Sequence, residues 1–317
     1  LMSNAIGESI SRLLEFSGAE VKRANYQGDI GLHVAKAVWG IRKLGFPADD
    51  AGKIGEAYVY GNKAYEEDDG AKREIKEINV KVYEKTDGEI NRIYKTGREV
   101  SLKHFEEIYE KLGTKFDFYF FESESQTKGL KIVQENIGRV FEKSDGAVVF
   151  RGEKFGLHTR VFINSEGLPT YEAKDLGLAE LKKEKYPADE YVVVTASEQK
   201  DYFKVVLKAL GEIDAELADK TRHITHGMMR LPSGKMSSRK GNVITGESLL
   251  EDAGELVFEK IKGEFSEEEK RKIVGAVSVA AVKYSILKQA AGGDIAFDFE
   301  KSVSFEGDSG PYLEYAA

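Results

Sequence analysis

The sequence predicts an α/β protein built on a parallel sheet, and one strand–helix unit carries most of that prediction. Residues 191–195 form a continuous apolar run, which is typical of a strand buried on both faces. The helix predicted next has one apolar face, made by Phe203, Val206, Leu207 and Leu210. Since a strand followed by a helix is the building unit of parallel sheets, the pair indicates that architecture.

A second helix–strand unit stands at the start of the chain. Residues 5–16 predict a helix that stops at Gly18, because glycine readily adopts the backbone conformation that ends a helix. Residues 20–25 predict a short strand that runs into a turn at residues 26–31. Because the sequence opens inside a helical pattern, we expect it to be part of a longer chain.

The middle of the chain predicts a helical insertion over residues 51–112. Its composition shifts towards charge, while a thin apolar stripe keeps helical spacing. Its last helix is predicted to begin at Ser101, a good capping residue, and to end at Gly113. A new element is predicted to begin at Phe116.

Three further patterns complete the fold prediction. Turn formers at residues 164–167 lie between apolar runs, which predicts a hairpin. A helix is predicted over residues 171–185, and a capping box at residues 266–269 opens a long helix that ends at the glycine pair 292–293. We therefore expect the last portion of the chain to be all-helical.

Composition limits the class of protein. The chain has 317 residues, of which 41% are hydrophobic and 32% charged, which excludes a disordered chain. No run of about 18 apolar residues could span a bilayer, and the lack of cysteine excludes disulfides, thiol catalysis and cysteine-ligated zinc. Without a secretion signal we expect the cytoplasm. The net charge of −8 argues against a general nucleic-acid coat but allows a local basic cleft.

Residues 226–241 contain the most informative pattern, in which cations lie between glycines. Glycines let the backbone approach an anion, while Lys235, Arg239 and Lys240 can follow the charge that grows during phosphoryl or nucleotidyl transfer. A solvated basic loop is the alternative. The histidines are scattered, and without cysteine or an HExxH pattern we expect no metal site.

Two other segments carry candidate binding residues. Tyr171 and Asp175 lie four residues apart at a predicted helix start, so their side chains project from one face. A phenol beside a carboxylate suits a guanidinium, although an exposed helix start also favours acids. Gln199 follows the strand predicted at residues 191–195, where open α/β sheets bind ligands; a polar residue at a helix start is the alternative.

These motifs resemble one family. Lys-Met-Ser at residues 235–237, with its basic tail, resembles the mobile KMSKS loop of class I aminoacyl-tRNA synthetases, and the string through Ile244 resembles the arginyl branch. The second lysine of that motif falls at Ser238, which leaves open which cation replaces it. The Thr-Tyr-x-x-x-Asp pattern and the closing string at residues 307–315 also resemble arginyl-tRNA synthetases.

The resemblance implies a Rossmann-like parallel nucleotide-binding sheet with a helical connective insertion and a C-terminal helical region. The expected parts are the first half of the catalytic domain at residues 1–50, the insertion at 51–112, the second half at 113–230, the KMSKS-like loop at 231–248 and the helical region at 249–317. In the family the closing string leads into an anticodon-binding domain, which we expect to follow.

The resemblance also implies which residues bind the substrate arginine. The tyrosine and aspartate of the family's pattern hold the substrate guanidinium, which implies that role for Tyr171 and Asp175. The family also shows a Glu-Ser pair whose acid completes the pocket. Glu124 fits this pair best, and Glu122 followed by Ser123 is the competing register.

The ATP site is implied in the same way. Lys235 is expected to contact the ATP phosphates, with Arg239 or Lys240 as further catalytic cations and Mg²⁺ neutralising the pyrophosphate. The other residues expected to bind ATP are Gln199, Gly227, Met228, Met236, Ser237 and Ser238.

The implied reaction is that of an arginine–tRNA ligase. Arginine would be activated with ATP to arginyl-adenylate and passed to the 3′ end of tRNA(Arg), by a monomer. The family's HIGH signature is expected to precede Leu1, so we expect the fragment itself to be inactive. Two alternatives remain: another class I synthetase or nucleotidyltransferase, and a non-catalytic binding module derived from a synthetase.

Overall fold

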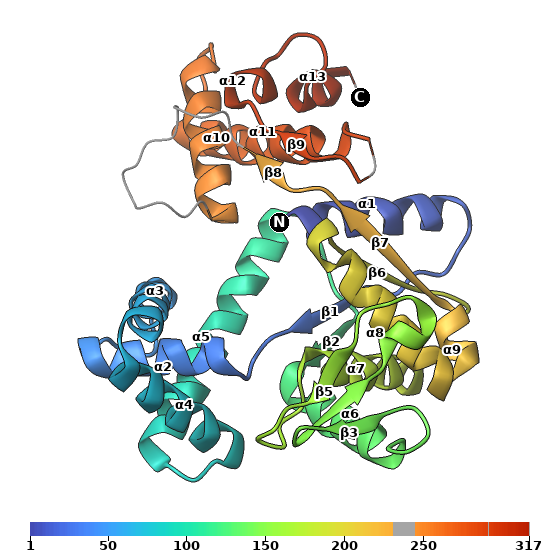
Figure 1. Ribbon diagram of the computed structural model, residues 1–317. Coiled ribbons are helices and arrows are strands. Elements are labelled where there is room, and N and C mark those ends of the chain that lie inside the picture. The colour runs from blue at the N-terminus through green and yellow to red at the C-terminus, as the bar shows by residue number, and fades with distance from the viewer. Residues whose placement is uncertain (231–244, 291, 317) are drawn as a thin grey trace. The chain divides into compact units, whose positions relative to one another are not determined.

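The computed structural model describes residues 1–230, 245–290 and 292–316 (Figure 1). The described chain forms two compact units. The terminal unit holds residues 1–21, 111–114 and 188–317, and the middle unit holds residues 22–110 and 115–187.

The middle unit contains one parallel strand pair. β1 (Ala24–Gln27) pairs with β2 (Phe118–Phe121) in register from their first to their last residues. β1 begins at Ala24 and not at residue 20, and the segments before the two strands are joined by the Arg23 amide, which donates to the Asp117 carboxylate at 2.7 Å. The prediction of a parallel α/β sheet is confirmed.

Four successive helices of the middle unit pack around one core. They are α2 (Leu32–Leu44), α3 (Ala51–Glu67), α4 (Asp69–Glu84) and α5 (Gly88–Lys111). A shared core of α2 and α4 side chains holds them together, with Val38, Trp39, Ile75 and Val82 buried. The Trp39 indole donates a hydrogen bond of 2.7 Å to Glu74. This core explains the thin apolar stripe of the sequence.

The start of α5 corrects one prediction. The helix begins at Gly88, and the Asp87 carboxylate accepts hydrogen bonds from the Glu89 and Ile90 amides, both at 3.1 Å. Asp87 therefore caps the helix, and Ser101 lies in its interior. The predicted end holds, since Gly113 follows with a φ of +62°.

The two apolar runs of the predicted hairpin belong to a three-stranded antiparallel sheet, and their pairing differs from the prediction. The strands of this sheet are β3 (Glu142–Ser144), β4 (Ala147–Phe150) and β5 (Arg160–Ile163), in the order β3-β4-β5. Both apolar runs precede the turn at residues 164–167 and pair through a loop that contains the 3-10 helix η1 (Gly152–Phe155). Beyond the turn the chain makes one bridge, Ile163 with Pro169, flanked by backbone hydrogen bonds from Asn164 to Leu168 and from Thr170 to Phe162. The pairing extends no further because a helix begins at Tyr171.

Helices α6 (Glu122–Glu135) and α7 (Tyr171–Lys185) pack at backbone contact, and α7 confirms its predicted span. A Cβ added at Gly129 would lie 1.9 Å from the Ala173 carbonyl oxygen. A Cβ at Gly177 would lie 2.0 Å from the Ser125 carbonyl oxygen. Only glycine at these two positions allows the helices to approach so closely.

The terminal unit contains the second parallel pair. Its elements up to residue 226 are α1 (Met2–Phe16), β6 (Tyr191–Ala196), the 3-10 helix η2 (Ser197–Gln199), α8 (Lys200–Ile213), α9 (Ala215–Asp219) and β7 (Thr221–His226). β6 and β7 pair in parallel over six residues. The expectation that β6 is buried on both faces was wrong: its residues are half-buried and Val192 is 37% exposed, because β7 is its one strand neighbour in the described chain.

The remaining elements follow residue 228. They are β8 (Met229–Arg230), α10 (Gly246–Lys260), α11 (Glu267–Leu287), β9 (Ile295–Ala296), α12 (Phe299–Ser302) and α13 (Gly310–Ala316). The capping box of Ser266 and Glu269 is confirmed, and α11 ends before the predicted glycine pair. The last portion is not all-helical, because β9 pairs in parallel with β8.

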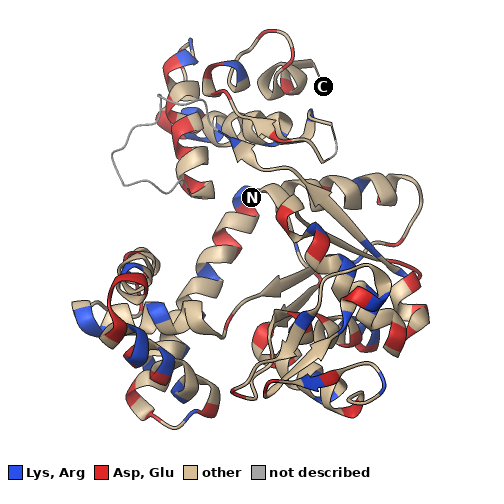
Figure 2. Cartoon of the chain, in the orientation of Figure 1, with Lys and Arg blue, Asp and Glu red and all other residues tan. Residues whose placement is uncertain are grey.

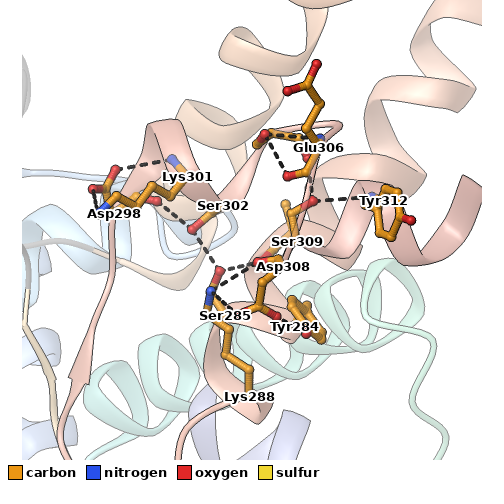
Figure 3. Close-up of polar contacts among 12 residues, drawn as sticks. Tyr284, Ser285, Lys288, Asp298, Lys301, Ser302, Glu306, Asp308, Ser309 and Tyr312 are labelled. Carbon is orange, nitrogen blue, oxygen red and sulfur yellow. Dashed lines mark hydrogen bonds and ion pairs between the residues drawn. The ribbon is translucent and has the colours of Figure 1, made fainter.

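Polar contacts hold the closing string on α11 (Figure 3). The Tyr284 hydroxyl donates to Asp308, and the Lys288 ammonium lies 3.4 Å from the same carboxylate. Beside these contacts, the buried hydroxyls of Ser285 and Ser302 lie 2.7 Å apart. The string therefore closes against this helix through side chains as well as backbone.

Charged residues of both signs are interspersed along α3, α4 and α5 (Figure 2). This pattern agrees with helices that expose one face to water. In the described ranges, no helix has the length and apolar character needed to cross a bilayer.

Candidate functional site

The middle unit gathers acids where its two parallel strands end. The pairing of β1 with β2 brings Gln27 opposite Phe121 at the strand ends. Glu122 follows β2 at once, and Gly28 and Asp29 follow β1, so these residues meet at the carboxyl edge of the sheet. Open α/β sheets bind ligands at this edge.

The Asp29 carboxylate accepts three hydrogen bonds within this cluster. This buried group accepts from the Ser123 amide at 2.9 Å and the Ser123 hydroxyl at 2.8 Å. The Arg98 guanidinium of α5 donates a third bond at 2.9 Å and stacks over the Phe121 ring at 4.2 Å. Asp29 thus fixes the start of α6 to the turn after β1.

Glu122 lies in the same cluster with a cation beside it. The Lys174 ammonium of α7 donates a hydrogen bond of 2.9 Å to Glu122 Oε2, and both side chains are less than 10% exposed. A Cβ at Gly28 would lie 3.2 Å from Glu122 Oε1 and 3.3 Å from His33 Nε2. Glycine at this turn therefore leaves room at the second oxygen of Glu122.

Tyr171 and Asp175 approach the cluster from the first turns of α7. The Tyr171 ring is 56% exposed and lies 5.0 Å from the Lys174 ammonium. Burial and then the Glu122 charge raise the pKa of the Tyr171 phenol. The charge of Asp175 reaches Tyr26, whose hydroxyl lies 2.8 Å from Ser125 Oγ.

The pKa of the Tyr26 phenol reflects the negative charges of the cluster. Burial raises the pKa of its phenol above the ordinary value, the hydrogen bond shared with Ser125 lowers it, and the charges of Glu122, Asp175 and Asp29 raise it further. The phenol is therefore neutral at pH 7. Carboxylates, phenols and one ammonium surround this edge, a set that can bind a ligand cation with several donors.

The structure distinguishes the two registers of the Glu-Ser pair. Glu124 lies on an exposed position of α6, whereas Glu122 is buried beside Lys174. Ser123, the partner of Glu122 in the competing register, is bound to Asp29. The geometry therefore favours Glu122, not Glu124, as the acid of the cluster.

The candidate ATP-binding residues of the terminal unit lie after its two parallel strands. Gln199 follows β6 in η2 and is exposed. Gly227 follows β7 and is buried, since a Cβ there would lie 2.1 Å from the Gly293 carbonyl oxygen. The Met228 amide donates to Asp294 at 2.9 Å, so it already has an acceptor.

The candidate residues of the basic loop lie outside the described residues. They are Lys235, Met236, Ser237, Ser238, Arg239 and Lys240.

Three residues of the cluster escaped sequence reasoning. Asp29 and Tyr26 belong to the turn after β1, and their place at a strand end was a signal that could have identified them. Lys174 lies between Tyr171 and Asp175, yet a single helical lysine carries no signal without its buried partner.

Comparison with solved structures identifies the fold. The chain superposes on Thermus thermophilus arginyl-tRNA synthetase with a TM-score of 0.74, at 22% identity, over 99% of this chain and 60% of the other. For arginyl-tRNA synthetase from Plasmodium falciparum the TM-score is 0.77, at 20% identity, over 99% and 53%. The chain therefore has the class I aminoacyl-tRNA synthetase fold.

Sequence relatives narrow the class to one family. The family described as tRNA synthetases class I (R), catalytic domain, matches residues 1–299, and the chain belongs to it. It is 31% identical to the arginine–tRNA ligase of Treponema pallidum over 328 residues and to that of Borrelia turicatae over 334. Each match covers 99% of this chain, which spans 56% and 57% of those relatives.

Proposed function

We propose that the chain is the catalytic core of an arginine–tRNA ligase. Such an enzyme activates arginine with ATP to arginyl-adenylate and transfers the arginyl group to the 3′ end of tRNA(Arg). The observation that carries the proposal is the cluster of Tyr171, Asp175 and Glu122 at the carboxyl edge of the β1–β2 pair. Family membership supports it.

In this proposal the cluster holds the substrate guanidinium. Asp175 and Glu122 offer carboxylate oxygens, and Tyr171 offers an exposed aromatic face and a hydroxyl. A guanidinium has five N–H donors in a plane, which match such acceptors better than an ammonium does. Glu122 takes the role that the sequence alone suggested for Glu124.

ATP is proposed to bind through the terminal unit and the basic loop. Lys235, with Arg239 or Lys240, would contact the phosphates, and Gln199 would lie at the end of β6. We propose that Mg²⁺ binds together with ATP, because this ion is usually held by substrate phosphates and one or two carboxylates. A monomer in the cytoplasm is part of the same proposal.

The proposed activation step requires little acid–base chemistry from the protein. The arginine carboxylate is already ionised at pH 7 and is the nucleophile that attacks the α-phosphate of ATP, releasing pyrophosphate. Rate enhancement would come from aligning the two substrates and stabilising charge on the phosphates. The cluster would supply alignment and selectivity, because a neutral analogue leaves its buried acceptors unpaired.

A calorimetric titration of the chain tests the proposal. Arginine, lysine and citrulline are titrated separately, each with and without a non-hydrolysable ATP analogue. We expect arginine-selective heat, and we expect Asp175→Asn to weaken arginine binding by about tenfold or more while leaving analogue binding unchanged.

Asp49→Asn is the matched control. Asp49 is exposed and makes no hydrogen bond or ion pair with a described residue, so its variant should bind arginine like the parent chain. Absence of arginine binding to a folded chain, or equal loss of arginine and analogue in Asp175→Asn, would contradict the proposal.

A further inference from the structure

The ion pair of Lys174 with Glu122 is built into the packing of two helices. Glu122 opens α6 and Lys174 lies in the first turn of α7. These helices are locked at backbone contact by Gly129 and Gly177, which fixes the two backbones that carry the pair. The 2.9 Å contact between ammonium and carboxylate is thus held by the fold and not by flexible loops.

The ammonium of Lys174 also reaches the aromatic groups of the cluster. It lies 5.0 Å from the centre of the Tyr171 ring, and its charge acts on the Tyr83 phenol of α4. Burial alone would lower the pKa of Lys174, but the Glu122 carboxylate and these phenols raise it above its ordinary value. Lys174 therefore stays charged across the physiological range.

Glu122 uses its two oxygens differently. Oε2 accepts from Lys174, while in the described chain no residue donates a hydrogen bond to Oε1, the oxygen that faces Gly28. A buried carboxylate without a cation is costly, and its pKa rises until it takes up a proton. The cation on one oxygen keeps the other available as an ionised acceptor.

We propose that Lys174 is a positioning residue of the arginine pocket, which holds Glu122 ionised and oriented so that Glu122 Oε1 accepts from the substrate guanidinium. The inference rests on the proposed function. Lys174 itself does not touch the substrate in this arrangement. It acts through Glu122.

Removal of the ammonium gives a pH signature that simple loss of packing would not. In Lys174→Met the Glu122 carboxyl is buried without its cation, and burial without a partner favours the neutral, protonated form of a carboxyl. We therefore expect this variant to bind arginine weakly at low pH and more tightly as rising pH favours the ionised form. The groups that face Glu122 and could also titrate or shift its charge are Asp29, His33, Tyr26, Tyr83, Arg98, Tyr171 and Asp175.

The experiment compares arginine affinity by calorimetry for the parent chain, Lys174→Met and Lys174→Arg at about pH 6 and about pH 9. All of the facing groups are present in each protein, so a difference in pH dependence belongs to the substitution. Lys174→Met should bind arginine about tenfold more weakly at pH 6 and regain most of that loss at pH 9. Lys174→Arg keeps a cation and should follow the parent profile.

Lys76→Met is the control, because Lys76 is exposed on α4 and makes no contact with the cluster. Binding of arginine to Lys174→Met at parent strength or tighter would overturn the inference while leaving the proposed function intact. Equal pH-independent losses in Lys174→Met and Lys174→Arg would also overturn it, and Lys174→Arg keeps the test open if Lys174→Met does not fold. A parent chain that binds no arginine would instead refute the proposed function.

Discussion

Gly129→Ala tests whether the close contact of α6 with α7 contributes to the stability of the middle unit. A Cβ at this position would lie 1.9 Å from the Ala173 carbonyl oxygen and 2.6 Å from its carbon. These atoms belong to the backbone of α7, so no rotamer change can relieve the contact. The helices must move apart, or the turn that carries Ala173 must deform.

The magnitude follows from the size of this overlap. Ordinary contact begins near 3.4 Å, so the added carbon is about 1.5 Å too close. Overpacking of this kind costs about 1–3 kcal/mol, while alanine returns about 1 kcal/mol of helix propensity relative to glycine. Because the overlap is with backbone, we take the upper end and expect the free energy of unfolding to fall by about 2 kcal/mol.

Gly55→Ala is the matched control in the same unit. Gly55 lies inside α3, and a Cβ there would meet nothing within 4 Å. The same chemical change should therefore stabilise the protein by up to about 1 kcal/mol. The two variants differ in sign, so an effect of alanine as such cannot produce both results.

The assay is urea unfolding followed by tryptophan fluorescence and circular dichroism. Trp39 is the one tryptophan of the sequence, and it is buried in the middle unit that contains both substitutions. Its fluorescence therefore reports unfolding of that unit. If Gly129→Ala were as stable as Gly55→Ala, the backbone contact and the reasoning built on it would be refuted.

Two other predictions concern buried and capping acids. Asp29→Asn removes the charge that accepts from Arg98 and Ser123, and we expect a loss of about 2 kcal/mol in unfolding free energy, measured in the same urea assay; an unchanged midpoint would contradict the network. Asp68 caps α4 by accepting from the Ala71 and Gly70 amides, which lower its pKa. A lowered folded-state pKa contributes stability above the unfolded value of about 3.9 that is lost as pH falls through the folded pKa. Asp68→Ala should therefore lower the urea midpoint at pH 7, and its difference from the parent chain should shrink in acid; a difference independent of pH would show that the cap is not the cause.

Local patterns predicted the helices well because each was decided by neighbouring residues. The span of α7 and the capping box of Ser266 and Glu269 agree with the sequence. The start of α5 was missed because Asp87 and Ser101 are both good caps, and choosing between them requires knowing that Ile90 is buried in the core. Propensity at one position could not supply that tertiary fact.

Strand predictions depended on partners that the sequence does not reveal. The run that became β6 has the composition of a fully buried strand, yet it is half-buried with β7 as its described neighbour. The apolar runs of β4 and β5 pair through a loop of nine residues and not through the strong turn at residues 164–167. Turn chemistry was identified correctly and two backbone hydrogen bonds cross the turn, but the chain enters α7 at Tyr171 before a second strand can form.

The candidate site shows the same division between local and tertiary information. Tyr171 and Asp175 could be paired from helical spacing alone, because residues four apart share a face. Glu122 and Glu124 could not be ranked in that way, since both follow β2 within three residues. The choice follows from two long-range contacts, Lys174 on the Glu122 carboxylate and Asp29 on the Ser123 amide, which join segments more than 50 residues apart. The proposed cation pocket therefore depends on packing, because the contact between α6 and α7 positions both Glu122 and Lys174.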